Sequence, residues 1–205
     1  MRVKICGLSK PEEVETCIKY KADFCGFILN YKKSHRYISF EQVKKLITID
    51  KKDSSYVAVL VEPSEEELKI FSALNFDYFQ LYGKYNDQDI LNIKNKYKKK
   101  IITSIQVKKK EDVQNYKNVS FSSDIILWDS SGYAESVSWD YNWIKTITIK
   151  QPKMIAGNIS VEKLRDISEM TDIVDASGAL ETNKVKDINK IKKFITAVKN
   201  INNEN

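Results

Sequence analysis

The sequence predicts a single α/β domain of the (β/α)8 class, a TIM barrel. Short apolar runs alternate with longer amphipathic segments eight times along the chain, and no low-complexity linker interrupts them. Doubly wound open sheets usually have about five or six strands, whereas eight units in 205 residues match the lower size limit of a closed barrel. We expect the barrel to cover residues 1–200 and residues 201–205 to form a frayed C-terminal tail.

The strands are expected in short apolar runs that end at loops, and a helix is expected after each strand. Capping residues mark several helix starts, such as Ser9 with Glu12 and Ser39 with Gln42. The predicted strands are Val3–Cys6, Phe24–Leu29, Tyr56–Val61, Tyr78–Leu81, Ile101–Ile105, Ile125–Asp129, Met154–Ala156 and Ile173–Asp175. The predicted helices cover about 10–20, 40–48, 64–72, 87–98, 110–117, 140–148, 161–168 and 187–200.

The charge balance favours a small anionic ligand over a nucleic acid. The net charge is +6, from 34 basic and 28 acidic residues. Much of the excess lies in the lysine-rich stretches 94–100 and 108–110, at predicted helix ends and on polar helix faces, where solvation is the commoner role. We therefore expect no nucleic-acid partner, whereas a mildly positive field suits an anionic substrate.

The cysteine and histidine content indicates a reduced, cytoplasmic protein without a metal centre. Cys6, Cys17 and Cys25 make an odd number in a sequence that shows no secretory signal, so structural disulfides are not expected. The single histidine, His35, and the absence of a C-x-x-C pair argue against a zinc site. No apolar run approaches the roughly 20 residues of a membrane span, so no membrane partner is expected.

In a barrel of this class, catalytic groups lie at the carboxyl ends of the strands and in the loops that follow. Cys6 ends the first predicted strand and shares a face with Lys4, while Asp129 ends the sixth and points inward with Leu127. A thiolate and a carboxylic acid facing each other across a substrate are suited to moving protons. For Cys6 alone, a buried cysteine acting as a small apolar side chain remains an equal alternative. Arg36, after the second strand, is suited to hold a carboxylate or phosphate.

The loops after the last two strands contain small residues that let a ligand approach the backbone. Gly157 and Asn158 follow the seventh strand, and Ser177, Gly178 and Ala179 follow the eighth. This pair of loops is the usual phosphate site of such barrels, where backbone N–H groups bind the anion. A glycine in either loop, taken alone, is more often a turn residue. Together with the strand ends, the loops indicate acid–base isomerisation of a phosphorylated small molecule.

These segments resemble the phosphoribosylanthranilate isomerase family of tryptophan biosynthesis. The resemblance covers nearly the whole chain, in the family's order, and its most specific parts are the first segment and the aspartate strand. The segments are Lys4-Ile5-Cys6-Gly7-Leu8, Ala22-Asp23, Gly26-Phe27-Ile28, Ser34-His35-Arg36-Tyr37-Ile38, Gln80-Leu81-Tyr82-Gly83, Leu127-Trp128-Asp129-Ser130, Ala156-Gly157, Asp175-x-Ser177 with Glu181, and Lys186-Asp187.

The resemblance implies an Amadori rearrangement, with Cys6 as general base and Asp129 as general acid. The substrate would be N-(5-phosphoribosyl)anthranilate and the product 1-(2-carboxyphenylamino)-1-deoxyribulose 5-phosphate, with no cofactor. Arg36 would hold the anthranilate carboxylate, and Gln80 would be among the substrate-binding residues. The partner would be this small phosphorylated molecule, and the protein a monomer or a homodimer.

Several positions depart from the family pattern. Tyr82 stands where the family has histidine, Thr103 where it has lysine, and Asn158 where it has a second glycine. Ser177-Gly178-Ala179 replaces Ser-Ser-Gly, and residues 131–136 contain one glycine in a segment that is glycine-rich in the family.

Because Cys6, Asp129 and Arg36 are kept, we expect a divergent, working member of the family. The alternative from another class is a non-catalytic phosphosugar-binding barrel derived from it. Indole-glycerol-phosphate synthase is disfavoured, since its reaction needs a lysine acid and a glutamate at strand ends, and the fifth strand offers Thr103.

Overall fold

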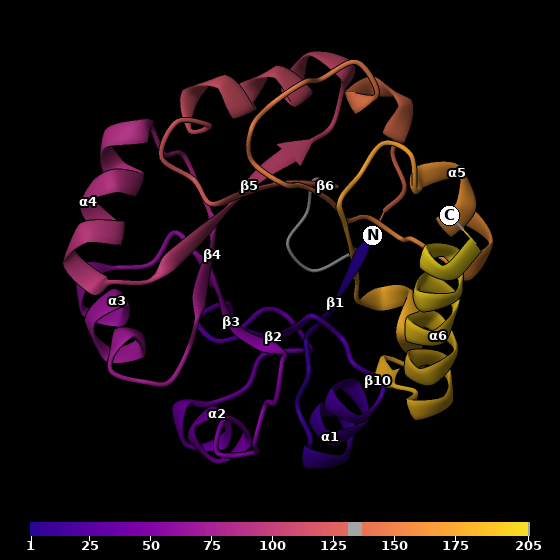
Figure 1. Cartoon of the computed structure of the whole chain (residues 1–205). Helices are drawn as coiled ribbons and strands as arrows, with labels where there is room; N and C mark the ends of the chain where they lie inside the picture. Colours follow the sequence, from indigo (N-terminus) through magenta and orange to yellow (C-terminus); the bar gives the residue numbers. More distant parts are fainter. Residues whose placement is uncertain (131–136, 205) are drawn as a thin grey trace.

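The computed structural model describes residues 1–130 and 137–204, which form a closed barrel of parallel strands surrounded by helices (Figure 1). The strands pair in chain order from β1 to β8, and β8 closes the ring on β1 with Lys4 opposite Asp175. The predicted (β/α)8 fold is therefore confirmed. The strands are β1 (Arg2–Cys6), β2 (Phe24–Ile28), β3 (Ser55–Val61), β4 (Tyr78–Tyr82), β5 (Lys100–Val107), β6 (Ile125–Ser130), β7 (Lys153–Ile155) and β8 (Ile173–Ala176).

Regular α-helices follow the first four strands and the last one, each where an amphipathic segment was predicted. At α2, the Ser39–Gln42 capping box is present: Gln42 N donates to Ser39 Oγ at 3.3 Å, and Ser39 N donates to Gln42 Oε1 at 2.9 Å. The helices are α1 (Pro11–Lys19), α2 (Phe40–Leu46), α3 (Glu65–Ser72), α4 (Asp87–Tyr97) and α6 (Ile188–Glu204).

The predicted Ser9–Glu12 cap of the first helix is wrong. The helix begins one residue later than that pairing requires, because Pro11 occupies its first turn, where the fixed φ of proline suits a helix start. Glu13 then takes the capping role, and its carboxylate accepts hydrogen bonds from Ser9 N at 2.7 Å and Lys10 N at 3.2 Å.

The units after β5, β6 and β7 have shorter or tighter helices than predicted. Residues Lys110–Asn118 form the 3₁₀ helix η1, Tyr141–Ile144 form η2, and Val161–Lys163 (η3) lead into α5 (Leu164–Ile167). Val113 is the single buried residue of η1. Residues 131–136, whose departure from the glycine-rich family segment is noted above, lie outside the described residues.

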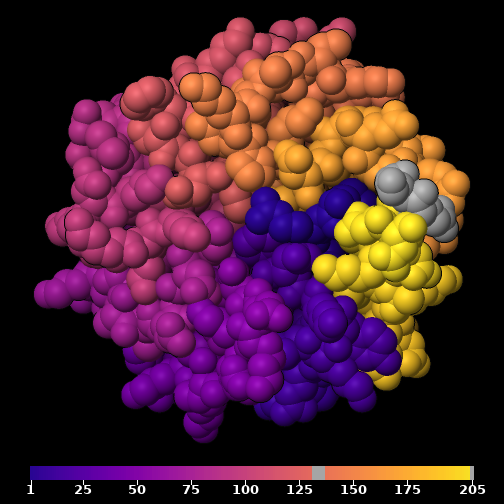
Figure 2. All heavy atoms as spheres, viewed as in Figure 1, coloured from indigo at the N-terminus to yellow at the C-terminus, as the bar shows by residue number. Residues whose placement is uncertain are grey.

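Two further features follow β8. A short 3₁₀ helix, η4 (Gly178–Leu180), leads into a two-stranded hairpin of β9 (Glu181–Thr182) and β10 (Val185–Lys186), which the sequence did not predict. Helix α6 then continues to Glu204, and Asn202 hydrogen bonds with both the amino group and the carbonyl of Met1. Figure 2 shows the N- and C-terminal residues side by side on the surface of the molecule. A domain boundary at residue 200 stays a prediction.

The strands separate an inner core from an outer one. Alternate residues of β6 illustrate this: Ile125 and Leu127 pack inside the barrel, whereas Ile126 and Trp128 pack against the surrounding helices. Asp129 therefore continues the inward-facing row, as predicted, and emerges at the carboxyl end of the barrel. In the described ranges, no helix is both long and apolar enough to cross a membrane.

Candidate active site

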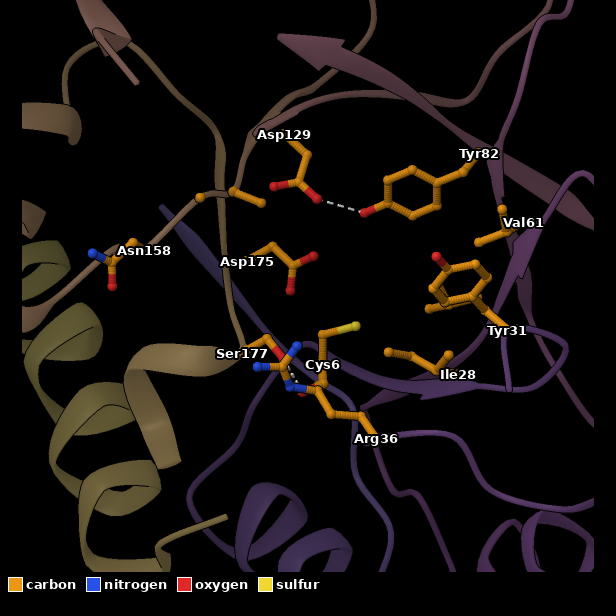
Figure 3. Close-up of a pocket in the computed structure, with 13 residues that line it drawn as sticks. Cys6, Ile28, Tyr31, Arg36, Val61, Tyr82, Asp129, Asn158, Asp175 and Ser177 are labelled. Atoms are coloured by element: carbon orange, nitrogen blue, oxygen red, sulfur yellow. Dashed lines mark hydrogen bonds between the residues drawn. The ribbon is translucent and has the colours of Figure 1, made fainter. Parts of the chain in front are cut away.

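A pocket opens at the carboxyl ends of the barrel strands, where enzymes of this fold place their catalytic groups (Figure 3). Its empty volume, which includes open solvent at the mouth, is about 630 Å³. Polar and ionisable groups from several strands line it beside an apolar wall. The lining residues are Cys6, Ile28, Tyr31, Arg36, Val59, Val61, Tyr82, Asp129, Ala156, Gly157, Asn158, Asp175 and Ser177.

The Cys6 thiol lies at the floor of this pocket, above the buried ammonium group of Lys4. Gly26 on the neighbouring strand makes room for both: a Cβ atom at that position would lie 3.1 Å from Cys6 Sγ and 3.1 Å from Lys4 Nζ. Burial raises the pKa of the Cys6 thiol, and the positive charge of Lys4 only partly offsets this effect. The resting thiol is therefore protonated at neutral pH.

Lys4 is paired with Asp175, its partner across the seam that closes the barrel. Nζ of Lys4 lies 2.7 Å from Oδ2 of Asp175, and both side chains are buried. Burial alone would lower the pKa of Lys4, but the charges of Asp175 and Cys6 outweigh it and raise this pKa. The other oxygen of Asp175, Oδ1, is buried at the pocket and finds no hydrogen-bond donor among residues 1–130 and 137–204.

Asp129 faces the same space from β6 (Figure 3). Tyr82 Oη donates to its Oδ2 at 2.7 Å, and the Ser130 backbone N–H donates to its Oδ1 at 2.7 Å. The pKa of Asp129 is raised to about 6, mainly by burial; the hydrogen bond from Tyr82 lowers it, and the nearby charge of Asp175 raises it. A carboxyl group with this pKa can hold a proton near neutrality and release it to a substrate.

Arg36 lies at the pocket edge, held from behind by Glu181 of the hairpin. Its Nε lies 2.5 Å from Glu181 Oε1, and Nη2 donates to Oε2 at 3.1 Å. Lys186 Nζ and His35 Nε2 contact the same carboxylate at 2.8 and 3.0 Å. Burial would raise the pKa of Glu181, but the hydrogen bond from Arg36 and the charge of Lys186 bring it to about 2. This network keeps Arg36 directed along the pocket edge.

The loop after β7 keeps a backbone suited to glycine, although one glycine of the family pattern is replaced. Gly157 has a φ of +108°, and Asn158 has a left-handed φ of +50°, which asparagine tolerates better than most residues. Both residues line the pocket. Asn158 Nδ2 donates to Ser138 Oγ at 3.3 Å, so its side chain contacts the end of the preceding loop.

The predicted site residues separate into those that reach the pocket and those that lie behind it. Ser177 lines the pocket, and its Oγ donates to the Cys6 carbonyl at 3.0 Å, whereas Gly178 and Ala179 begin η4 outside the lining. Gln80 is fully buried beneath Tyr82, to which its Nε2 donates at 3.1 Å. The other predicted residues, which are Cys6, Arg36, Asp129, Gly157 and Asn158, come together at the lining.

Four residues matter to this site in ways that sequence reasoning did not assign. Asp175, Glu181 and Lys186 belong to the segments that carry the family resemblance, and Tyr82 was noted as a departure from it, but none received a role. An inward-facing carboxylate at the end of β8 was the signal available for Asp175. In the part of the chain that the structure describes, no cluster of three or more metal-ligating side chains occurs.

Comparison with known proteins finds relatives along the whole length. A sequence-family model described as N-(5'phosphoribosyl)anthranilate (PRA) isomerase matches residues 3–197. The N-(5'-phosphoribosyl)anthranilate isomerase of Streptococcus mutans serotype c is 32% identical over 201 residues, which is 97% of this chain and 98% of that protein.

Solved structures agree with the sequence comparison. Monomers generated from the dimeric phosphoribosylanthranilate isomerase of Thermotoga maritima match with a TM-score of 0.84 at 25% identity, covering 98% of this chain and 99% of that one. A phosphoribosyl anthranilate isomerase in complex with reduced 1-(o-carboxyphenylamino)-1-deoxyribulose 5-phosphate matches with a TM-score of 0.79 at 25% identity, with the same coverage.

Proposed function

The chain belongs to the N-(5'-phosphoribosyl)anthranilate isomerase family of tryptophan biosynthesis, and we propose that Asp129 and Cys6 make the two proton transfers of its reaction. That reaction is the Amadori rearrangement of N-(5-phosphoribosyl)anthranilate to 1-(2-carboxyphenylamino)-1-deoxyribulose 5-phosphate. One observation carries the choice of residues. A buried carboxyl from β6 and a buried thiol from β1 face the same pocket, with room for a substrate between them (Figure 3).

In the first step, Asp129 donates its proton to the ring oxygen of the ribose. The bond between C1 and that oxygen breaks, and the lone pair of the anthranilate nitrogen forms an iminium ion at C1. The pKa of Asp129, which burial raises to about 6, makes the group an effective donor near neutral pH. The carboxylate left behind accepts hydrogen bonds from Tyr82 and from the Ser130 backbone.

In the second step, Cys6 as thiolate removes the proton from C2. The electron pair of the C2–H bond forms a C1–C2 double bond and neutralises the iminium nitrogen, which gives an enolamine. Tautomerisation of this enolamine yields the ketone. The thiolate needs a positive neighbour in so buried a place, and the Lys4 ammonium supplies it from the layer below.

The pocket offers a group for each polar part of the substrate. Arg36 is suited to bind the anthranilate carboxylate, and Asp175, which also lines the pocket, is suited to bind a ribose hydroxyl. Backbone N–H groups of the loops at Gly157–Asn158 and Ser177–Ala179, of which Gly157, Asn158 and Ser177 line the pocket, are suited to bind the phosphate. The analogue bound in the structural neighbour contains the same kinds of group, namely a carboxyphenyl ring, hydroxyls and a phosphate. No step requires a cofactor.

The assembly and location of the protein are further parts of this proposal. The related Thermotoga maritima enzyme is described as dimeric, and for this chain either a monomer or a homodimer is compatible with a pocket formed by one barrel. We place the enzyme in the cytoplasm, where reduced cysteines persist.

A turnover assay tests the proposed function. The purified protein is mixed with N-(5-phosphoribosyl)anthranilate, and conversion is followed by the change in anthranilate fluorescence. An isomerase consumes the substrate and forms the ribulose phosphate, which chromatography identifies. A protein that binds the reduced product analogue but converts no substrate is the non-catalytic barrel, and that result would refute the proposal.

A further inference from the structure

Two consecutive hydrogen bonds connect the buried side chain of Gln80 to Asp129, the proposed proton donor. Gln80 and Tyr82 share a face of β4, and Gln80 Nε2 donates to Tyr82 Oη at 3.1 Å. Tyr82 Oη in turn donates to Asp129 Oδ2 at 2.7 Å, across 47 positions of sequence (Figure 3). Tyr82 lines the pocket, whereas Gln80 is fully buried beneath it.

The direction of these hydrogen bonds follows from the amide of Gln80. A tyrosine hydroxyl has one proton, and because Oη accepts from Gln80, that proton is left for Asp129. The amide oxygen of Gln80, Oε1, is buried and has no hydrogen-bond partner in residues 1–130 and 137–204. The opposite amide orientation would give Oε1 the hydroxyl proton of Tyr82 and take it from Asp129. In the observed orientation, Gln80 Oε1 is left unpaired and Asp129 keeps the hydrogen bond from the Tyr82 hydroxyl.

We propose that Gln80 and Tyr82 are positioning residues of the proton donor: Gln80 directs the hydroxyl proton of Tyr82 onto Asp129, and Tyr82 holds the carboxylate that forms when Asp129 gives its proton to the substrate. The proposal rests on the proposed function, in which Asp129 is the acid. It gives Gln80 a role that does not involve contact with substrate, and it gives Tyr82 a role at a position where the family pattern has histidine.

The groups that face Asp129 act on it in opposite directions. Asp175 on β8 repels the carboxylate and raises its pKa, as burial does, while Lys4 on β1 lowers it. Cys6 on β1, Tyr82 on β4 and Tyr141 of η2 are further ionisable groups near it. Among these side chains, Tyr82 donates a hydrogen bond directly to Asp129.

A carbon-13 NMR titration of the free enzyme tests this without any need for turnover. The Asp129 carboxyl signal is assigned by its loss in Asp129→Asn, and its pKa is then compared in Tyr82→Phe, Gln80→Met and the double variant. We expect Tyr82→Phe to raise the pKa of Asp129 by about one unit, because the carboxylate loses a charge-assisted hydrogen bond. Gln80→Met should raise it by a smaller amount, since Tyr82 remains but is no longer directed.

The double variant shows whether Gln80 acts by directing the Tyr82 hydroxyl or by a separate packing effect. If Gln80 acts through the hydroxyl, Gln80→Met shifts nothing further once Tyr82 is phenylalanine, whereas independent structural effects would add. Tyr78→Phe is the matched control, because it removes a hydroxyl from the same strand and face at the far end of β4. It should leave the pKa of Asp129 unchanged. Thermal unfolding of every variant confirms that each is folded.

Kinetics then connect the titration to catalysis. Between the pKa values of Asp129 and Cys6, the pair holds one proton, and below the lower value both groups are protonated and the thiolate is lost. The acid limb of kcat/KM should therefore move to higher pH in Tyr82→Phe, with little change in affinity for the reduced product analogue. The phosphate group of the substrate titrates in the same way with every variant, so the test uses only the difference between the pH profiles of the variants.

The two proposals fail in distinguishable ways. An unchanged Asp129 pKa in Tyr82→Phe, or additive shifts in the double variant, would overturn the positioning role even if the wild-type enzyme turns over normally. A wild-type protein without turnover would refute the proposed function, and the NMR shifts would still report whether Gln80 and Tyr82 control Asp129.

Discussion

Cys6 and Asp129 have pKa values displaced in the same direction by the same cause. Burial raises the pKa of Asp129 to about 6 and raises that of the Cys6 thiol above its ordinary value. At neutral pH the resting pair is therefore a thiol and a carboxylate, the reverse of what the reaction requires. The reactive pair holds the same number of protons and forms when one proton changes place, so its population is constant between the two pKa values.

Replacing Cys6 tests its role as the base. Cys6→Ser should leave the fold and the affinity for the reduced product analogue intact, because the hydroxyl occupies similar space at the pocket floor. Turnover should fall by about 10²-fold or more, since a serine hydroxyl is a far weaker acid than a thiol and supplies almost no anion to act as the base. The measurement is kcat with N-(5-phosphoribosyl)anthranilate, and a value within about tenfold of the wild type would show that another group removes the C2 proton.

Cys6 and Asp129 could be found from the sequence, because the alternation of side chains along a strand is enough to place each of them at the mouth of the barrel. Sequence reasoning placed Lys4 on the same face as Cys6, but it could not find the partners that are distant in the chain. Tyr82 lies 47 positions from Asp129, and Lys4 lies 171 positions from Asp175. Gln80 was predicted as a substrate-binding residue, and the structure instead places it one layer below the pocket.

Among the elements, strands were easier to predict than helices. The eight strands are buried on both faces and form continuous apolar runs, a signal that survives without knowledge of the fold. The segments after β5, β6 and β7 form short or 3₁₀ helices, a geometry that the apolar pattern of a sequence does not distinguish from an α-helix. The hairpin of β9 and β10 consists of two-residue strands, too short for any periodic pattern.

The loop after β7 allows a paired test at one position. Asn158 has a φ of +50°, so Asn158→Gly should be nearly neutral for kcat/KM and for stability, because the backbone supplies the N–H groups at this loop. Asn158→Ala retains those N–H groups but strains the backbone and should cost about 1 kcal/mol in unfolding free energy. Chemical denaturation and steady-state kinetics measure both. Large loss of substrate affinity in Asn158→Gly would show that the side chain itself binds the phosphate.

At the scale of the whole molecule, the first and last strands of the barrel meet at the functional site. β1 supplies Cys6 and Lys4, and it closes the barrel against β8, which supplies Asp175. The hairpin that follows β8 supplies Glu181, which fixes Arg36 from the loop after β2. Closure of the barrel therefore brings these parts of the site together.

The Glu181 network gives the molecule a specific response to acid. The pKa of Glu181 in the folded protein is about 2, below the ordinary value of 4.5, so its contribution to stability is complete above pH 4.5 and is lost as pH falls toward 2. Glu181→Gln should lower the unfolding free energy at pH 7 by roughly 3 kcal/mol, because Arg36 and Lys186 lose a partly buried partner.

Urea denaturation of the wild type and Glu181→Gln at several pH values measures this contribution. The difference between the two proteins should be constant from pH 7 to about 4.5 and should shrink below that, as the wild-type carboxylate gains its proton. A difference that does not depend on pH across this range would show that the glutamate stabilises the hairpin through packing, with no ionic contribution.

The most direct test of Asp129 as the proton donor is the kcat of Asp129→Asn with N-(5-phosphoribosyl)anthranilate, measured beside its affinity for the reduced product analogue. Asparagine keeps the shape of the side chain and can still accept a hydrogen bond from Tyr82, but it has no acidic proton to give. We predict that kcat falls by roughly 10²–10⁴-fold while the affinity stays within about threefold. Turnover that survives the substitution, or equal losses in turnover and affinity, would contradict the assignment of Asp129 as the acid.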